Sequence, residues 1–207
     1  MHNTRKYEMT DDSQGSSVAE PENSFITAKA FESRTVLIFG AISDIVARDV
    51  AQRLITLDAA SSKPITVIVS SPGGHVESGD AIHDVVRFIR SPVRMIGTGW
   101  VGSAATHLFL AVTSENRVCL PNTRFLIHQP SGGIGGKETD IAIQAREILL
   151  VRERIAKTIA CATGHPLEKV MSDIERDNWL SASEAVDYGL ASKIIENRSE
   201  LEDHQDL

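Results

Sequence analysis

Residues 94–112 read RMIGTGWVGSAATHLFLAV: an apolar run, a glycine-rich turn and an apolar segment with helical spacing. Within it, Gly97, Gly99 and Gly102 have the G-x-G-x-x-G spacing of a dinucleotide-binding turn. Ser103 follows the last glycine directly, at the start of the expected helix, where a serine nucleophile can also lie. The stretch therefore allows two opposed interpretations, a turn that binds a pyrophosphate and a turn that presents a serine.

The segments around this stretch alternate between strand and helix patterns. Ser43 is the expected N-cap of one helix, and Ser181 with Glu184 has the spacing of a capping box. We expect strands at 34–40, 65–71, 93–97, 117–121, 124–129 and 191–196, and helices at 43–62, 78–91, 103–114, 141–163 and 181–189. This alternation predicts an α/β fold of βαβ units with mostly parallel strands.

Composition and charge narrow the class of protein. The chain has 207 residues, of which 42% are hydrophobic and 24% charged, as is typical of a soluble globular domain. A net charge of −7 without a block of Lys and Arg argues against nucleic acid as a partner. Cys119 and Cys161 are isolated, which predicts neither a disulfide framework nor a metal site. No apolar run reaches the roughly 20 residues of a membrane span, so we expect a cytoplasmic protein without a cofactor.

Neither glycine motif has the partners that nucleotide binding needs. A dinucleotide site requires an acidic residue at the end of the next strand, and RVCLPN at 117–122 ends without one. The segment SGGIGGKE at 131–138 approaches a phosphate loop, but Ser131 replaces its first glycine. Glu138 stands where that loop has the Ser or Thr that binds magnesium. We therefore reject both phosphate-binding interpretations.

A serine nucleophile needs a base, an orienting acid and two N–H donors for the oxyanion. His128 is the strongest candidate base, because it follows an apolar strand at the edge where functional groups of parallel sheets collect. His75 remains possible, and the other histidines read as surface or packing residues. The backbone N–H groups of Gly74 and Ala104 are the candidate donors. Spacing alone leaves four candidate acids, namely Asp140, Asp173, Asp177 and Asp187.

Several long motifs together resemble the ClpP family, the proteolytic subunits of the ATP-dependent Clp protease. They are SPGG at 71–74, Ser103 after its turn, CLPNTRFLIHQPSGG at 119–133, TDIAIQAREIL at 139–149 and ERDNWLSASEAVDYGL at 175–190. The resemblance extends from about residue 34 to residue 196 and implies a serine endopeptidase. It assigns the triad to Ser103, His128 and Asp177, and the oxyanion hole to the N–H groups of Gly74 and Ala104.

The resemblance also implies an assembly. The family has a spiral of βαβ units related to the crotonases, with a projecting handle of a strand and a long helix that matches residues 129–163. Handles interlock two heptameric rings around a closed chamber, and a peptide substrate pairs with the backbone at Gly132, Gly133 and Ile134. The expected organisation is a polar leader at 1–24, disordered or processed, a peptidase domain at 25–197 and a solvated acidic tail at 198–207.

The expected partners are a Clp AAA+ unfoldase and a second ClpP paralogue. The family's pocket for the unfoldase is rich in aromatic residues, whereas the matching positions here are Thr66, Ile68, Phe88 and Val118. This difference predicts that the subunit docks an unfoldase only within a mixed barrel. Two alternatives stay open, a ring subunit with low activity and a crotonase-like acyl-CoA enzyme. The latter is disfavoured because Ser103 and His128 stand in place of paired carboxylates.

Overall fold

We describe the protein from a computed structural model, which covers residues 21–133 and 135–201. The helices are α1 (Pro21–Glu32), α2 (Asp44–Ala60), α3 (Val76–Phe88), α4 (Ala104–Phe109), α5 (Glu138–Thr163), α6 (Leu167–Asp173) and α7 (Ala182–Tyr188). The strands are β1 (Thr35–Phe39), β2 (Ile65–Ser71), β3 (Val93–Gly102), β4 (Arg117–Cys119), β5 (Arg124–Ile127), β6 (Asn178–Ser181) and β7 (Lys193–Ile194). The described residues also contain two 3₁₀ turns, η1 (Ser114–Asn116) and η2 (Arg198–Leu201).

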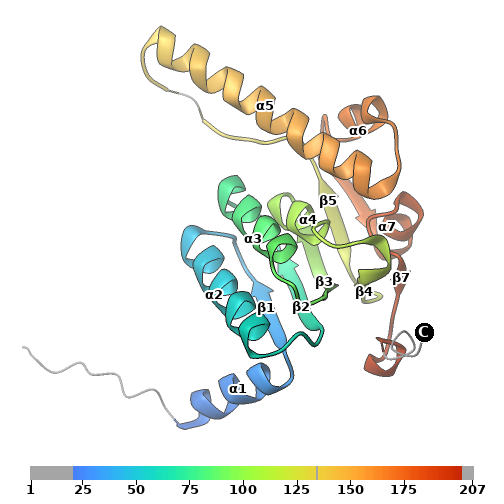
Figure 1. Cartoon of the computed structure of the whole chain (residues 1–207). Helices are drawn as coiled ribbons and strands as arrows, with labels where there is room; N and C mark the ends of the chain where they lie inside the picture. The colour runs from blue at the N-terminus through green and yellow to red at the C-terminus, as the bar shows by residue number, and fades with distance from the viewer. Residues whose placement is uncertain (1–20, 134, 202–207) are drawn as a thin grey trace, which may run out of the picture.

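The strands form one sheet in which β3 is central. The main path runs β1-β2-β3-β4-β7 with parallel pairing, and β5 pairs in parallel with the far end of β3. Among the described strands, only β6 is antiparallel, and it pairs with β5. As Figure 1 shows, α2, α3 and α4 lie side by side along one side of the sheet, and α5 projects beyond it. The predicted α/β architecture with mostly parallel strands is confirmed.

The glycines of the opening stretch allow β3 to change partners. Its first half pairs with β4 and its last residues pair with β5, so the strand must bend between them. Gly99 lies at this bend with a φ of +59°, a conformation that favours glycine. The G-x-G-x-x-G spacing therefore shapes a bent strand that ends at Gly102, directly before Ser103.

Some expected elements differ from the observed ones. Ser43 caps α2, and Ser181 with Glu184 forms the expected capping box of α7. The sequence patterns predict no element at α1, α6 or β6, and α1 begins inside the segment 1–24 that was expected to be a leader. Residues 1–20 and 202–207 lie outside the described residues. Within 129–137, apart from residue 134, no strand is present, so the expected handle strand is not observed there.

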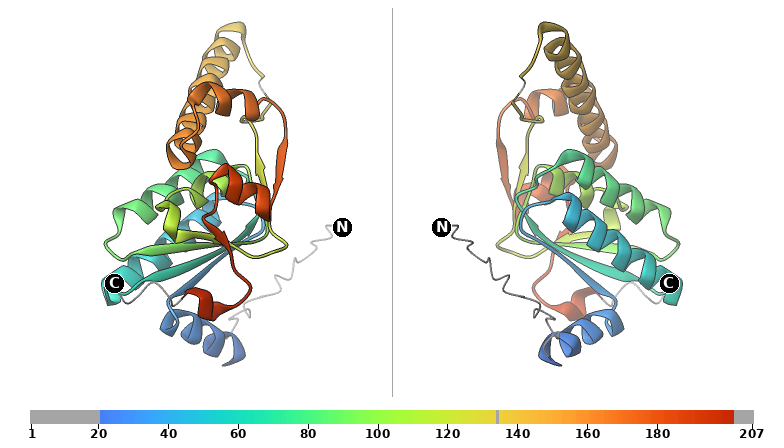
Figure 2. Two further views of the ribbon diagram at one scale, coloured as in Figure 1. Left: turned by 90° about the vertical axis from the view of Figure 1, so that its right-hand side faces the viewer. Right: turned by 90° about the vertical axis from the view of Figure 1, so that its left-hand side faces the viewer.

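Residues 198–207 were expected to form a solvated tail, and in the described part Arg198 and Ser199 are exposed whereas Glu200 and Leu201 are partly buried. The turn η2 packs against the sheet, where Leu201 contacts a small apolar cluster that includes Ile96 and Ile195. Arg94 donates a hydrogen bond of 2.8 Å to the carbonyl of Leu201, and Lys193 one of 2.9 Å to that of Glu200. Figure 2 shows this turn beside the sheet, on the side away from the projecting helix.

The exposure of the apolar side chains changes along the long helix α5. Ile143 and Leu149 expose more than half of their surface, whereas Ala156 and Ile159 near its end are buried against the rest of the fold. In residues 21–133 and 135–201, no helix combines the length and apolar character needed to cross a membrane. The exposed apolar side chains on the projecting half of α5 indicate a contact surface.

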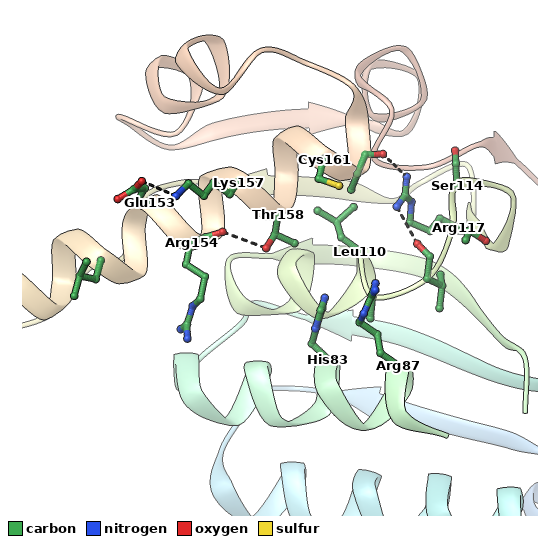
Figure 3. A pocket seen from close by; sticks show the side chains of 15 residues that line it. His83, Arg87, Leu110, Ser114, Arg117, Glu153, Arg154, Lys157, Thr158 and Cys161 are labelled. Atoms are coloured by element: carbon green, nitrogen blue, oxygen red, sulfur yellow. Dashed lines mark hydrogen bonds and ion pairs between the residues drawn. The ribbon is translucent and has the colours of Figure 1, made fainter. Parts of the chain in front are cut away.

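Arg117 forms hydrogen bonds with the ends of α5 and α7 and with the segment after α4. Its side chain is only 1% exposed, and it donates hydrogen bonds to the carbonyls of Val112 at 3.0 Å, Ala162 at 2.8 Å and Gly189 at 3.2 Å. The carbonyls of Ala162 and Gly189 lie at the negative ends of α5 and α7, and that of Val112 lies in the segment that follows α4. Figure 3 shows Arg117 beside the groove between α5 and the helices α3 and α4. Desolvation lowers the pKa of Arg117, yet an arginine stays charged at neutral pH.

We expect Arg117→Met to destabilise the protein strongly, because three partly buried carbonyls, two of them at helix ends, lose their donor. The cost should be about 3 kcal/mol, which lowers the midpoint of thermal unfolding by roughly 6 to 12 °C. Arg90→Met is the matched control, because the Arg90 side chain is 83% exposed. Calorimetry that found equal shifts for the two variants would contradict this role of Arg117.

Candidate active site

Ser103 occupies a strained turn between β3 and α4. Its φ of 55° and ψ of −122° are rare for a residue with a side chain and cost on the order of 1–3 kcal/mol. Its N–H donates to the carbonyl of Leu126 at 2.9 Å, and the hydroxyl of Thr106 donates to the carbonyls of Val101 and Leu126. These bonds fix the turn and place Ser103 directly after β3. They do so although the sequence has no second glycine after Ser103.

The SPGG segment lies directly against this turn. A side chain on Gly73 would put its Cβ 2.7 Å from the Cβ of Ser103 and 2.9 Å from the nitrogen of Ala104, so only glycine fits there. The neighbouring Gly74 has a φ of +150° and pairs with Ile42 in a short bridge. Ala104 begins α4, where an N–H group has no partner within the helix. The structure therefore brings the SPGG backbone close to the nitrogen of Ala104, beside Ser103.

The pairing of β5 with β6 brings His128 and Asp177 together. Ile127 pairs with Asn178 in the antiparallel register, so the residues just beyond each strand are neighbours. His128 Nδ1 lies 3.1 Å from Asp177 Oδ1. A histidine that donates through Nδ1 to a carboxylate keeps its Nε2 free to accept a proton. Of the four candidate acids, Asp177 is the one that contacts His128, whereas Asp173 is bound by Lys169 and Tyr188.

Ser103 and His128 line one small enclosed cavity of about 20 Å³. Its wall is completed by Val76, Ala104, Thr106, His107, Ile127, Pro130, Ile155 and Ile159. Among the described residues, Ser103 has no side-chain hydrogen bond to His128. Such bonds are often long in enzymes without substrate and tighten when it binds. The nucleophile and the base predicted from the sequence therefore face the same space.

The other predicted residues lie elsewhere or outside the described part. His75 contacts Asp44 and Ser78 at the start of α3 and does not line this cavity. Gly132 and Gly133 are exposed, and Ile134 lies outside the described residues, so the predicted peptide-binding backbone stays a prediction.

The sequence patterns do not single out His107, although it lines the cavity beside Ser103. It lies four residues after Ser103, on the same side of α4, and is only 6% exposed. Its Nε2 is 3.0 Å from Asp80 Oδ1, its ring stacks on His83, and Arg154 of α5 pairs with the other oxygen of Asp80. Desolvation, with smaller effects of His83 and Arg154 that outweigh Asp84, lowers the pKa of His107 to about 4. The imidazole is therefore neutral at physiological pH.

This buried histidine should make stability fall on acidification. The pKa of His107 is about 4 in the folded protein and near 6.5 when exposed, so between these values the unfolded chain binds the proton more strongly. Stability is therefore complete above pH 6.5, and up to about 3 kcal/mol is lost as the pH falls to 4. We expect His107→Leu to flatten this part of a plot of unfolding temperature against pH. Equal slopes for His107→Leu and the parent protein would exclude the buried neutral histidine.

Comparison with known proteins identifies the family. The sequence profile of the Clp protease family matches residues 18–198. The ATP-dependent Clp protease proteolytic subunit 3 of Rhizobium etli is 51% identical over 194 residues, which are 93% of this chain and all of that protein. Subunit 2 of Gluconobacter oxydans is 54% identical over 178 residues, covering 85% of this chain and 80% of that one.

The solved structure of ClpP1 from Listeria monocytogenes has the same fold. It superposes with a TM-score of 0.78 at 48% identity, over 85% of this chain and 99% of that one. The spiral of βαβ units that the resemblance implied is thus confirmed, and the acyl-CoA and nucleotide interpretations are set aside. The chain belongs to the Clp protease family of peptide hydrolases.

Proposed function

We propose that the chain is a serine endopeptidase subunit that hydrolyses peptides through an acyl-enzyme, with Ser103 as nucleophile. The observation that carries this proposal is the contact of 3.1 Å between His128 and Asp177 at a cavity that Ser103 also lines. Family membership supports it, since the relatives carry the name of proteolytic subunits. The low-activity ring subunit is the alternative that the experiment below tests.

In the proposed reaction, His128 Nε2 takes the proton of Ser103 as its Oγ attacks the peptide carbonyl carbon. Asp177 holds the imidazole and stabilises its positive charge. The N–H groups of Gly74 and Ala104 donate to the oxyanion of the tetrahedral intermediate. The C–N bond then breaks, and His128 gives its proton to the departing amine. Water attacks the acyl group in the same way, which releases the carboxylic acid and restores Ser103.

The proposed substrates are extended peptides and unfolded proteins, admitted to a chamber by a Clp ATPase. Backbone pairing with Gly132, Gly133 and Ile134 would bind them with little side-chain preference. The proposed chamber is formed by two stacked heptameric rings. The exposed apolar residues of α5, among them Ile143 and Leu149, support a role of this helix in the contact between subunits.

Replacing the nucleophile tests the mechanism. We expect Ser103→Ala to lower peptide hydrolysis at least about a thousandfold without changing assembly, because only a hydroxyl is lost. Asp177→Asn should also lose activity, because the amide stabilises the wrong tautomer of His128. Gly73→Ala should do so as well, because its Cβ displaces Ser103.

Two substitutions serve as matched controls for these variants. Ser172 is exposed on α6, and a Cβ on Gly135 meets no atom within 4 Å. Ser172→Ala and Gly135→Ala should therefore keep full activity. Turnover of a fluorogenic peptide and native mass spectrometry give both readouts. Undiminished turnover by Ser103→Ala would refute the triad, and an inactive parent protein that assembles normally would favour the low-activity ring subunit.

The proposed docking pocket for an unfoldase is small and partly filled. Thr66 and Ile68 line an apolar pocket of about 220 Å³, together with Leu201 of η2. Val118 is buried beneath it, and Phe88, at 82% exposure, does not line it. Aromatic anchors dominate the binding energy of such contacts, and this pocket has none in the described chain. We infer that productive docking requires a mixed barrel with a ClpP paralogue.

The pure protein should cleave short peptides but degrade folded proteins poorly with any Clp AAA+ ATPase. Loss of one aromatic anchor costs at least about 2 kcal/mol, or roughly thirtyfold in affinity, and the sites of a ring act together. Adding a paralogue with an aromatic pocket should restore degradation of a tagged folded substrate, and Ser103→Ala in this chain should reduce the restored rate. Efficient degradation by the pure protein would show that the pocket suffices.

A further inference from the structure

The SPGG backbone beside Ser103 is held from two sides. A Cβ on Gly73 would meet the turn of Ser103, and a Cβ on Gly74 would lie 2.3 Å from the carbonyl oxygen of Ile42. Ile42 donates its N–H to the carbonyl of Gly73 at 2.8 Å and accepts from the N–H of His75 at 3.0 Å. Because Ile42 directly precedes the cap of α2, the position of Gly74 depends on the segment at the start of that helix.

Gly74 carries the free N–H of this segment. The N–H of Gly73 donates to Ser71 Oγ at 3.1 Å, and that of His75 donates to Ile42. Within residues 21–133 and 135–201, the N–H of Gly74 donates no hydrogen bond, and Gly74 is exposed. Backbone N–H groups require an acceptor, so this one is available to an oxygen from outside the chain.

Three side chains join the start of α2 to the start of α3. Asp44 is the first residue of α2, His75 is the N-cap of α3, and Ser78 is the third residue of α3. Ser78 Oγ donates to Asp44 Oδ1 at 2.5 Å, and His75 Nδ1 lies 2.8 Å from Ser78 Oγ and 3.0 Å from Asp44 Oδ1. The other ring nitrogen of His75 lies 3.1 Å from Glu77 Oε2. We refer to Asp44, His75 and Ser78 as the α2–α3 cluster.

The α2–α3 cluster holds its carboxylate in a fixed place. Ser78 is only 3% exposed, so packing fixes the hydroxyl that donates to Asp44. Hydrogen bonds from Ser78 and then from His75 lower the pKa of Asp44, so its carboxylate is charged at neutral pH. Two helices begin here, and the partial positive charge of a helix N-terminus favours an anion. The ionised Asp44 therefore links the two helices beside the SPGG segment.

We propose that the α2–α3 cluster positions the N–H of Gly74 for the oxyanion, with Asp44 and Ser78 as positioning residues for hydrolysis. The inference rests on the proposed function, because an oxyanion forms beside Ser103 only in that mechanism. The cluster and the bonds of Ile42 connect the same two segments, residues 42–44 and 73–78. An oxyanion donor acts through its position, since it must lie about 2.7–3.1 Å from the oxygen that becomes charged. Loss of the cluster should therefore impair the oxyanion more than the binding of the peptide.

Two inhibitors separate these effects. With a peptidyl aldehyde, Ser103 Oγ forms a bond to the carbonyl carbon, the π electrons move to the oxygen, and the serine proton passes to His128. The matched peptidyl alcohol has the same side chains but no carbonyl, so its inhibition constant reports the binding of the peptide alone. We expect Asp44→Ala and Ser78→Ala to weaken the aldehyde at least about tenfold and to leave the alcohol unchanged. The kcat for a fluorogenic peptide should fall in parallel with the aldehyde affinity, whereas KM should stay the same.

Further variants show whether the effect belongs to the cluster. Asp44→Asn keeps an oxygen that accepts from Ser78 and should retain most of the aldehyde affinity. Asp49→Ala is the matched control on α2, because Asp49 pairs with Arg53 and its side chain is 55% exposed. It should change neither inhibition constant. The double variant of Asp44→Ala and Ser78→Ala should bind the aldehyde as well as either single variant, because both changes remove the same contact. Native mass spectrometry checks that all variants assemble equally.

The outcomes separate this inference from the proposed function. If a fluorophosphonate, which reacts with nucleophilic serines, does not label the parent protein, the serine mechanism is overturned and the inference with it. Normal labelling, with equal aldehyde affinity in the parent protein and both alanine variants, would overturn the inference alone. Equal weakening of aldehyde and alcohol would also overturn it, as would additive losses in the double variant. If Ser78→Ala does not fold, the comparison of Asp44→Ala with Asp44→Asn and Asp49→Ala decides the question.

Discussion

The arrangement of the other elements depends on the hydrogen bonds of Arg117. The carbonyls of Val112, Ala162 and Gly189 lie partly buried around one guanidinium, and those of Ala162 and Gly189 belong to helix ends that cannot satisfy them internally. The cation is compensated by carbonyl dipoles of distant segments. Because α5 is fixed at its end in this way, its preceding turns are held beside α4, and Ile155 and Ile159 form a wall of the cavity beside Ser103.

A second constraint is the single antiparallel pair in an otherwise parallel sheet. Parallel strands alone bring their carboxyl ends to one edge, and β5 delivers His128 there. Asp177 precedes β6, so it can meet His128 only because β6 runs in the opposite direction. Beyond the pair, the N–H of Gln129 donates to the carbonyl of Ile174 and extends the contact toward α6. The geometry of the proposed base and acid is therefore a property of strand direction.

Much of this fold could be predicted from local patterns, and the reasons are visible in particular residues. The strands β1 and β2 are apolar runs bounded by polar or glycine residues, and α2 carries its own cap at Ser43. In contrast, α1 has little amphipathic pattern, and β6 is a four-residue strand defined only by its partner. Its register also decides between Asp177 and the other acids, which spacing had left open.

The environment of His107 was equally invisible in the sequence. A lone histidine in an apolar helix pattern is indistinguishable from a packing residue until its neighbours are known. Asp80 and Arg154 lie 27 and 47 residues away along the chain, and only the packing of α3, α4 and α5 assembles the three. The sequence carries no local signal for this cluster, because its three residues meet only when the helices pack.

The backbone of Ser103 places activity and stability in opposition. Its φ of 55° and ψ of −122° belong to a region that glycine occupies without penalty, so serine is the more costly residue at this position. A glycine there would relax the turn and stabilise the fold, yet it would remove the only hydroxyl that the turn presents. Selection for stability alone would therefore favour glycine over serine at this position. The nucleophilic role proposed for Ser103 accounts for a serine at this costly position.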